Sequence, residues 1–200
     1  MNTALLVIDV QESFRQRPLW RTVSNPDIVD DVTRLVDAAR RRGDLVIWVL
    51  HAEPGTGTVF DPASGHVRPM DGLAPWEDEP VLTKTSYNAF TTTNLQQRLV
   101  GAGIGHVVVC GIRTEQCCET TARVACDLGY QVTFVTEATA TFPAPHWETP
   151  DLSVDELVAD PRTLPVEAVI ARTEYALAGR FATIATVAEL AAPREALTGS

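Results

Sequence analysis

The stretch Ala4-Leu5-Leu6-Val7-Ile8-Asp9 decides the fold, because five consecutive apolar residues end in a single carboxylate. An uninterrupted apolar run of this length is typical of a parallel strand covered by helices on both faces. Similar runs recur at residues 45–50 and 107–109 and do not alternate with polar residues. The sequence therefore predicts an α/β fold built on a parallel sheet.

Shorter apolar runs and helical patterns alternate along the rest of the chain. We predict further strands at 81–82, 106–112, 131–135 and 181–184, and helices at 26–42, about 93–100, 115–128 and in a short segment ending near Gly179. Asn25 is expected to cap the first of these helices, with Pro26 at its first position. The triple arginine 40–42 followed by Gly43 matches a helix end, although an anion site is the alternative interpretation.

Composition and charge limit the classes of function. The 200 residues favour one domain spanning 1–200, and a hydrophobic fraction of 45% with 21% charged residues argues against intrinsic disorder. The net charge of −10 disfavours binding to nucleic acid or to anionic membranes. The N-terminal segment lacks the basic start of a signal peptide, and no run reaches the ~20 apolar residues of a membrane span. We expect a cytoplasmic enzyme.

Two long segments and one glycine motif do not follow the strand–helix rhythm. Segments 52–79 and 138–165 are rich in proline and are predicted to be long functional loops, because such loops are usually lids or contact surfaces. The motif Gly101-Ala102-Gly103-Ile104-Gly105 follows a helix and precedes a strand, the reverse of what a phosphate loop requires. We therefore predict no nucleotide and no other organic cofactor.

Three reactive side chains fall where predicted strands end, which is where open parallel sheets bind ligands. Asp9 and Lys84 each end a strand, and Cys117 follows strand 106–112 at the start of a helix. With Thr114 as the N-cap, the sulfur would lie over unpaired amide protons, which favour a thiolate and could hold an oxyanion. A nucleophile, a carboxylate and a cation are sufficient for acyl transfer through a thioester.

Simpler interpretations exist for each of these residues. Asp9 could cap the next turn, and Lys84 alone could be a surface lysine. The four cysteines match neither a disulfide framework nor a zinc site, and are otherwise expected to be core residues. Periodicity does not choose the nucleophile between Cys117 and Cys118, since both can begin an apolar stripe of the helix. That all three candidates reach the same sheet edge favours the catalytic interpretation.

The chain resembles the isochorismatase-like cysteine hydrolase superfamily over roughly residues 3–142. The matching stretches are Ala4–Gln11, Lys84–Phe90 and Gly111–Cys117, together with Thr121-Ala122 and Gly129-Tyr130. The resemblance implies a three-layer α/β/α, Rossmann-like fold with a six-stranded parallel sheet. It also implies a catalytic triad of Asp9, Lys84 and Cys117, and its register selects Cys117 over Cys118.

The resemblance further implies a cis peptide bond between Ile112 and Arg113, and an oxyanion hole formed by the backbone amides of Arg113 and Cys117. The Arg113 side chain is unusual for the family, and either pairs with an anionic substrate group or points to solvent. Further substrate contacts are expected from Gln11, Phe14, Trp20 and Phe90, although core packing accounts equally well for Phe90.

Two departures from the family pattern concern the metal and the C-terminal part. Nicotinamidase-type members bind a metal through an Asp-x-His pair and a further histidine, whereas this chain has His51-Ala52-Glu53 and, later, His66. We predict no metal, because these residue types do not match the pattern. Segment 142–179 is longer than expected for the family and leaves the lid and the dimer surface open. Oligomers are common in the family, so a homodimer or larger homo-oligomer is expected.

The resulting prediction is a hydrolase that cleaves an amide, lactam or similar non-peptide C–N bond in a small molecule. Asp9 would take the Cys117 proton and deliver it to the leaving amine, and Lys84 would hold the carboxylate in place. Two alternatives remain open at this point. One is a vinyl-ether hydrolase in which the aspartate acts as a general acid without the cysteine. The other is a non-catalytic interaction domain on the same scaffold.

Overall fold

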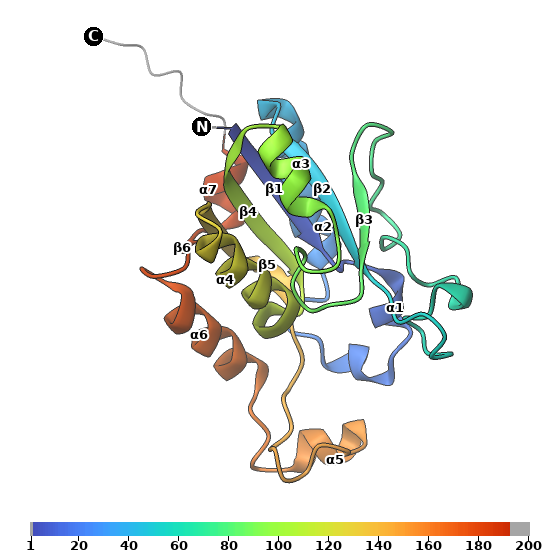
Figure 1. Ribbon diagram of the computed structural model, residues 1–200. Helices are drawn as coiled ribbons and strands as arrows, with labels where there is room; N and C mark the ends of the chain where they lie inside the picture. Colours follow the sequence, from blue (N-terminus) through green and yellow to red (C-terminus); the bar gives the residue numbers. More distant parts are fainter. Residues whose placement is uncertain (1, 193–200) are drawn as a thin grey trace.

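A six-stranded parallel sheet forms the centre of the protein in the computed structural model, which describes residues 2–192 (Figure 1). The strand order is β3-β2-β1-β4-β5-β6, and every adjacent pair is parallel. The strands are β1 (Asn2–Ile8), β2 (Leu45–His51), β3 (Val81–Lys84), β4 (Ile104–Ile112), β5 (Gln131–Ala140) and β6 (Thr183–Ile184). This confirms the predicted fold class.

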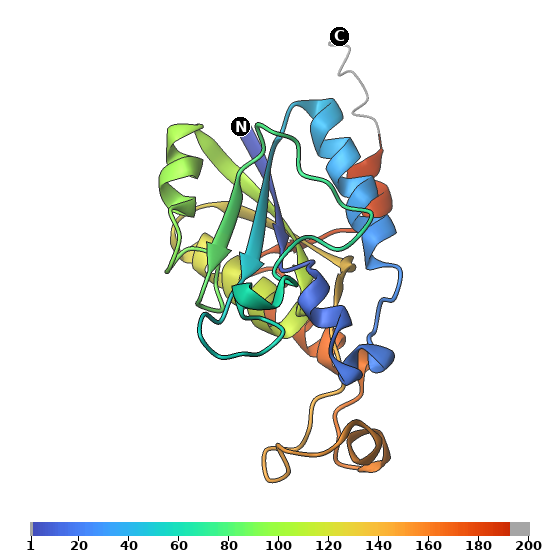
Figure 2. The same cartoon turned by 90° about the vertical axis from the view of Figure 1, so that its right-hand side faces the viewer.

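Helices cover both faces of the sheet, and Figure 2 shows the three layers side by side. The helices are α1 (Glu12–Arg15), α2 (Ile28–Arg42), α3 (Leu95–Gly101), α4 (Glu119–Asp127), α5 (Val154–Ala159), α6 (Val166–Leu177) and α7 (Val187–Ala191). One apolar cluster packs α3, α4 and α6 on one face, and a second packs α2 and α7 on the other. Residues of β1 alternate between these two clusters, which explains its uninterrupted apolar sequence.

The register of the central strands brings their carboxyl ends to one edge. Ile8 pairs with Val49 on one side and with Gly111 on the other, and His51 pairs with Lys84. Gly111 has a φ of +132°, and a Cβ on it would lie 1.9 Å from the Ile8 carbonyl oxygen. A glycine is therefore required where β4 approaches the end of β1.

Several predicted element ends differ from the structure. Helix α2 begins at Ile28 and not at Pro26; Asp27 occupies its N-cap position, and the Asn25 side chain accepts from the Asp27 amide just before the helix. The helix end is confirmed: Gly43 has a φ of +71°, and Arg40 and Arg42 bind acidic side chains. Strand β5 continues to Ala140, beyond the predicted loop start. Helices α1, α5 and α7 were not predicted; they have only four, six and five residues.

Residues 143–165, called the arm below, project from the body of the protein beyond the carboxyl ends of the strands (Figures 1 and 2). The arm carries α5, and an antiparallel bridge between Ala144 and Leu164 joins its two ends. It occupies most of the segment predicted as a long loop. Within residues 2–192, no helix has the length and apolar character needed to cross a bilayer.

Candidate active site

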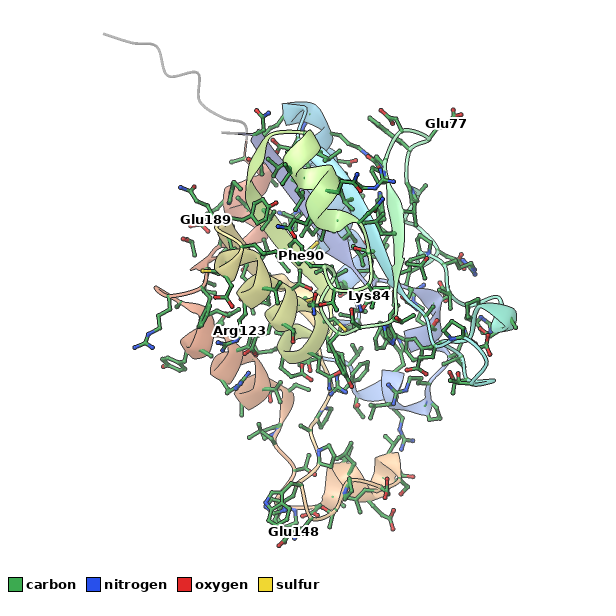
Figure 3. The ribbon with its side chains drawn as sticks, viewed as in Figure 1. Glu77, Lys84, Phe90, Arg123, Glu148 and Glu189 are labelled. Carbon is green, nitrogen blue, oxygen red and sulfur yellow. The ribbon has the colours of Figure 1, made fainter. Side chains whose placement is uncertain are left out.

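Asp9, Lys84 and Cys117 meet at the carboxyl edge of the sheet. Lys84 Nζ donates to Asp9 Oδ2 at 2.7 Å and to Cys117 Sγ at 3.4 Å. The Asp9 and Lys84 side chains are fully buried, and Cys117 is 7% exposed. Figure 3 shows Lys84 in the interior, near the lower ends of the strands as drawn. The two simpler interpretations, a surface lysine and a turn-capping aspartate, do not describe these residues.

The backbone around each residue explains these positions. Asp9 has a φ of +54°, which turns the chain sharply after β1 while its amide donates to the Val49 carbonyl. Lys84 ends β3, and its carbonyl accepts from the Ala52 amide. Cys117 lies in a π-helical turn, Thr114–Cys118, which precedes α4.

The predicted N-cap at Thr114 is wrong. The Thr114 hydroxyl forms a 2.8 Å hydrogen bond with the Thr139 hydroxyl on β5, and Arg113 occupies the cap position without a side-chain cap. The Arg113 carbonyl accepts from the amides of Gln116 and Cys118 and so closes the turn. The Ile112–Arg113 peptide bond that leads into the turn is cis.

Burial and the opposed charges of Asp9 and Lys84 dominate the electrostatics of the site. Complete burial raises the pKa of the Asp9 carboxyl, and the Lys84 ammonium opposes part of that shift. Burial lowers the pKa of Lys84, but Asp9 and Cys117 more than offset this effect, so its net shift is upward. Asp9 Oδ1 is buried and has no hydrogen-bond partner among residues 2–192. The carboxyl group therefore retains an oxygen that can accept a proton.

The thiol of Cys117 differs from the prediction. Burial raises the pKa of Cys117 to about 12; Asp9 acts in the same direction and Lys84 opposes it. This is opposite to the shift expected from a helix N-terminus, because desolvation of the sulfur outweighs the nearby amides. Cys117 is therefore a protonated thiol at neutral pH, and it needs a base in order to act as a nucleophile.

A cavity of about 320 Å³ opens beside Cys117. Its walls include the predicted residue Phe14 and several residues that sequence reasoning did not assign to the site: Arg17, Phe60, Thr85, Tyr87 and Gln116. His51 and Glu53 also line it, and His51 follows the rule used for Asp9, since it ends a strand. Gln116 lies in the same π-helical turn as Cys117. Arg17, Phe60, Thr85 and Tyr87 lie in loops whose paths the local sequence does not specify.

Three residues predicted to contact substrate are used elsewhere in the structure. The buried Gln11 side chain binds the His51 backbone on both sides, accepting from its amide at 2.7 Å and donating to its carbonyl at 3.0 Å. Trp20 packs edge-on against Phe142 with ring centroids 6.2 Å apart. Phe90 stacks on Tyr130 within the core beneath α3 and α4, so core packing describes it (Figure 3).

The Arg113 side chain turns inward and not to solvent. It is 15% exposed, its Nε lies 3.1 Å from Glu115 Oε1, and its guanidinium packs over the Phe142 ring at 5.2 Å. It lines a second cavity, next to the one beside Cys117. Arg113 precedes the π-helical turn and Cys117 lies within it. The oxyanion hole formed by their backbone amides stays a prediction.

The residues considered for metal binding do not converge. His51 Nε2 lies 3.5 Å from Glu53 Oε1, and its Nδ1 lies 3.4 Å from the Lys84 ammonium. Burial and Lys84 lower the pKa of His51. The His66 backbone carbonyl accepts from the Ser13 amide and hydroxyl, and its amide donates to the Ser64 hydroxyl. Across residues 2–192, no three histidine, cysteine or acidic side chains are grouped so that they could hold a metal ion.

Comparison with known proteins gives consistent results. Residues 3–162 match the model of the isochorismatase domain. The chain is 35% identical over 153 residues to Nicotinamidase 3 of Arabidopsis thaliana. The aligned region covers 70% of this chain and 73% of that protein. It is 33% identical over 157 residues to a streptothricin hydrolase of Streptomyces noursei, covering 75% of this chain and 53% of that protein.

Solved structures share the whole architecture. A cysteine hydrolase from Pseudomonas syringae pv. phaseolicola superposes with a TM-score of 0.81 at 25% identity, covering 95% of this chain and 91% of that one. Together with the domain match, this similarity extends from β1 through the strand ends that carry Asp9, Lys84 and Cys117. The chain belongs to the isochorismatase family and has its cysteine-hydrolase fold.

Proposed function

We propose that the protein hydrolyses a non-peptide amide or lactam C–N bond in a small molecule through a thioester on Cys117. The observation that carries this proposal is the contact of one ammonium, Lys84 Nζ, with both Asp9 Oδ2 and Cys117 Sγ. Two relatives named as nicotinamidase and streptothricin hydrolase support an amide substrate. The catalytic roles below follow from the chemistry of these three groups.

The first half of the reaction forms the thioester. Asp9 Oδ1 accepts the thiol proton as Cys117 Sγ attacks the substrate carbonyl carbon, which is necessary because burial raises the pKa of this thiol to about 12. The Arg113 and Cys117 amides stabilise the oxyanion. Asp9 then donates its proton to the nitrogen as the C–N bond breaks, and the amine leaves.

The second half restores the enzyme. Asp9 takes a proton from water as the water oxygen attacks the thioester carbonyl, and the C–S bond breaks to release a carboxylic acid. The proton returns to the sulfur, so the net reaction consumes one amide and one water. Lys84 stays protonated throughout, orients Asp9 and stabilises the anionic states next to it.

The test is a panel of small amides and lactams assayed for ammonia or amine release. Cys117→Ala should abolish release, whereas Cys126→Ala, which changes a thiol far from the site, should not. Intact-protein mass spectrometry after rapid quenching should detect an acyl adduct on the wild-type protein. Unchanged turnover by Cys117→Ala would exclude the covalent route.

The vinyl-ether route has one observation in its favour, since burial raises the pKa of Asp9 and so favours an acid form that can donate a proton. Isochorismate turnover that survives Cys117→Ala and is lost in Asp9→Asn would support that route. The acyl adduct would then be absent.

A further inference from the structure

A second cavity lies between the active-site entrance and the arm. Its volume is about 530 Å³, and Arg17 lines both this cavity and the one beside Cys117. Its walls come from the segment after α1, from Arg113 and from the arm. Because Arg17 lines both cavities, they lie next to each other. A ligand too large for the 320 Å³ inner cavity can therefore extend from Cys117 toward the arm.

Two guanidinium groups are the only charged side chains among the described residues that line this second cavity. Arg113 Nε lies near Glu115, yet it has no hydrogen-bond partner in residues 2–192, and no acidic side chain within them pairs with Arg17. The carboxylate of Glu115 is also engaged by the Thr141 hydroxyl at 2.5 Å. Glu115 compensates the charge of Arg113 in part, so the site offers the Arg17 guanidinium and the Arg113 Nε donor within a chain of net charge −10.

Both arginines line the same cavity. Burial lowers the pKa of Arg113; Glu115 opposes this shift and Arg17 adds to it, so the two positive groups interact electrostatically. The same guanidinium interacts with Cys117 and Tyr87. An anion between the two arginines would relieve their repulsion in a cavity that shares Arg17 with the one beside Cys117.

The remaining wall is apolar except for Ser153. Its apolar part consists of four prolines and four aliphatic residues: Pro18, Pro143, Pro145, Pro150, Leu19, Leu152, Val154 and Leu157. Most of these belong to the arm, the segment that projects from the body (Figure 2). Rigid apolar walls with a few charged groups at one side are typical of a site for a small amphiphilic molecule.

We propose that the substrate carries a carboxylate held by Arg17 and Arg113, and an apolar portion seated under the arm. This proposal names the chemical class of the substrate. It rests on the proposed function, because the bound molecule is a substrate only if the protein is a hydrolase. The binding site itself does not depend on catalysis. It can therefore be tested without turnover.

The test measures how fast iodoacetamide alkylates Cys117 at pH 9, by peptide mass spectrometry, with 3-phenylpropionate or the uncharged 3-phenyl-1-propanol present. The carboxylate should slow alkylation of Cys117 at concentrations about tenfold below those at which the alcohol does. Labelling of Cys126, which lies in a different part of the surface, is the internal control and should not change.

Variants then assign the effect to residues. Arg17→Gln and Arg113→Gln should each raise the half-protecting concentration of 3-phenylpropionate about tenfold, whereas Arg34→Gln on α2 removes the same charge and should leave it unchanged. Arg17→Gln keeps the test valid if Arg113→Gln does not fold. Leu157→Ala should weaken protection by 3-phenylpropionate but not by acetate.

Three outcomes would overturn the proposal: equal protection by acid and alcohol, full protection in Arg17→Gln, or equal protection by inorganic phosphate, which lacks an apolar part. Failure of the proposed function has a different signature, because amide turnover would be absent or would survive Cys117→Ala while protection by 3-phenylpropionate persisted. The two failures are therefore distinguishable.

Discussion

Lys84 Nζ lies 2.7 Å from Asp9 Oδ2, and neither side chain is exposed to solvent. A buried ion pair is stable only because each charge compensates the other, and removal of one partner leaves an uncompensated charge in the interior. The pair joins β1 to β3 across β2, which separates them in the sheet. It thus has a structural consequence that can be measured independently of catalysis.

Lys84→Met should therefore destabilise the protein by about 3–5 kcal/mol, whereas the double variant Asp9→Asn/Lys84→Met should be more stable than Lys84→Met alone. The free energy of unfolding in urea for the wild type, both single variants and the double variant gives the coupling. Additive effects of the two substitutions would mean that the two groups do not interact in solution.

The pH profile of kcat/KM should reveal Asp9. Only the ionised carboxylate can accept the thiol proton, and burial raises the pKa of Asp9 above the ordinary range of an aspartate. Activity should therefore fall as the pH decreases through a value above the ordinary range of an aspartate. Circular dichroism over the same range separates this loss from acid unfolding. If kcat/KM fell only at or below the pH at which an ordinary aspartate is protonated, Asp9 would not be the base.

The sequence was sufficient to predict that the site lies at the carboxyl edge of the sheet. It was not sufficient to predict that the Cys117 thiol has a raised pKa. Asp9 and Lys84 directly follow apolar strand residues, and parallel strands bring such positions together. Cys117 and Cys118 are alike in sequence pattern, yet Cys118 is fully buried while Cys117 contacts Lys84. The pKa of Cys117 depends on desolvation by parts of the chain far from residue 117.

Long-range contacts also explain the errors in the loops. Thr114 precedes a polar run and matches an N-cap, but its hydroxyl is taken by Thr139, 25 residues later. Arg17 belongs to no motif, and it reaches the site because the chain after α1 runs along the strand ends. An antiparallel bridge between Ala144 and Leu164 pairs the two ends of the arm, and no local sequence pattern predicts this pairing.

Cys110 should make the protein sensitive to alkaline pH. Burial raises the pKa of its thiol from 9.0 to about 12, so its stabilising contribution is complete below about pH 9 and is lost as the pH rises toward 12. Each such thiol lowers the free energy of unfolding by about 1.4 kcal/mol per pH unit within that window. Cys110→Ala should reduce the slope by this amount.

Urea unfolding between pH 8 and 10.5, with a reductant present, measures that slope. Cys126→Ala is the matched control, since Cys126 is only partly buried and its removal should leave the slope nearer to that of the wild type. Identical slopes for the wild type and Cys110→Ala would show that the thiol ionises inside the folded protein, or that the strand end opens at alkaline pH.

Gly111→Ala should prevent normal folding, whereas Gly65→Ala should be tolerated. Both glycines have positive φ, at +132° and +76°, so both variants bear backbone strain of about 1 kcal/mol or more. A Cβ at Gly65 has no atom within 4 Å, but at Gly111 it would lie 1.9 Å from the Ile8 carbonyl oxygen. That overlap can be relieved only if β4 moves away from β1 beside Asp9.

Soluble yield and thermal unfolding followed by circular dichroism compare the two variants. Gly65→Ala should unfold cooperatively a few degrees below the wild type, since a 1 kcal/mol loss shifts the midpoint by about 2–4 °C in a protein of this size. Gly111→Ala should be insoluble or lack a cooperative transition. If both variants melted alike, β1 and β4 would have to be further apart at Ile8 than the structure shows.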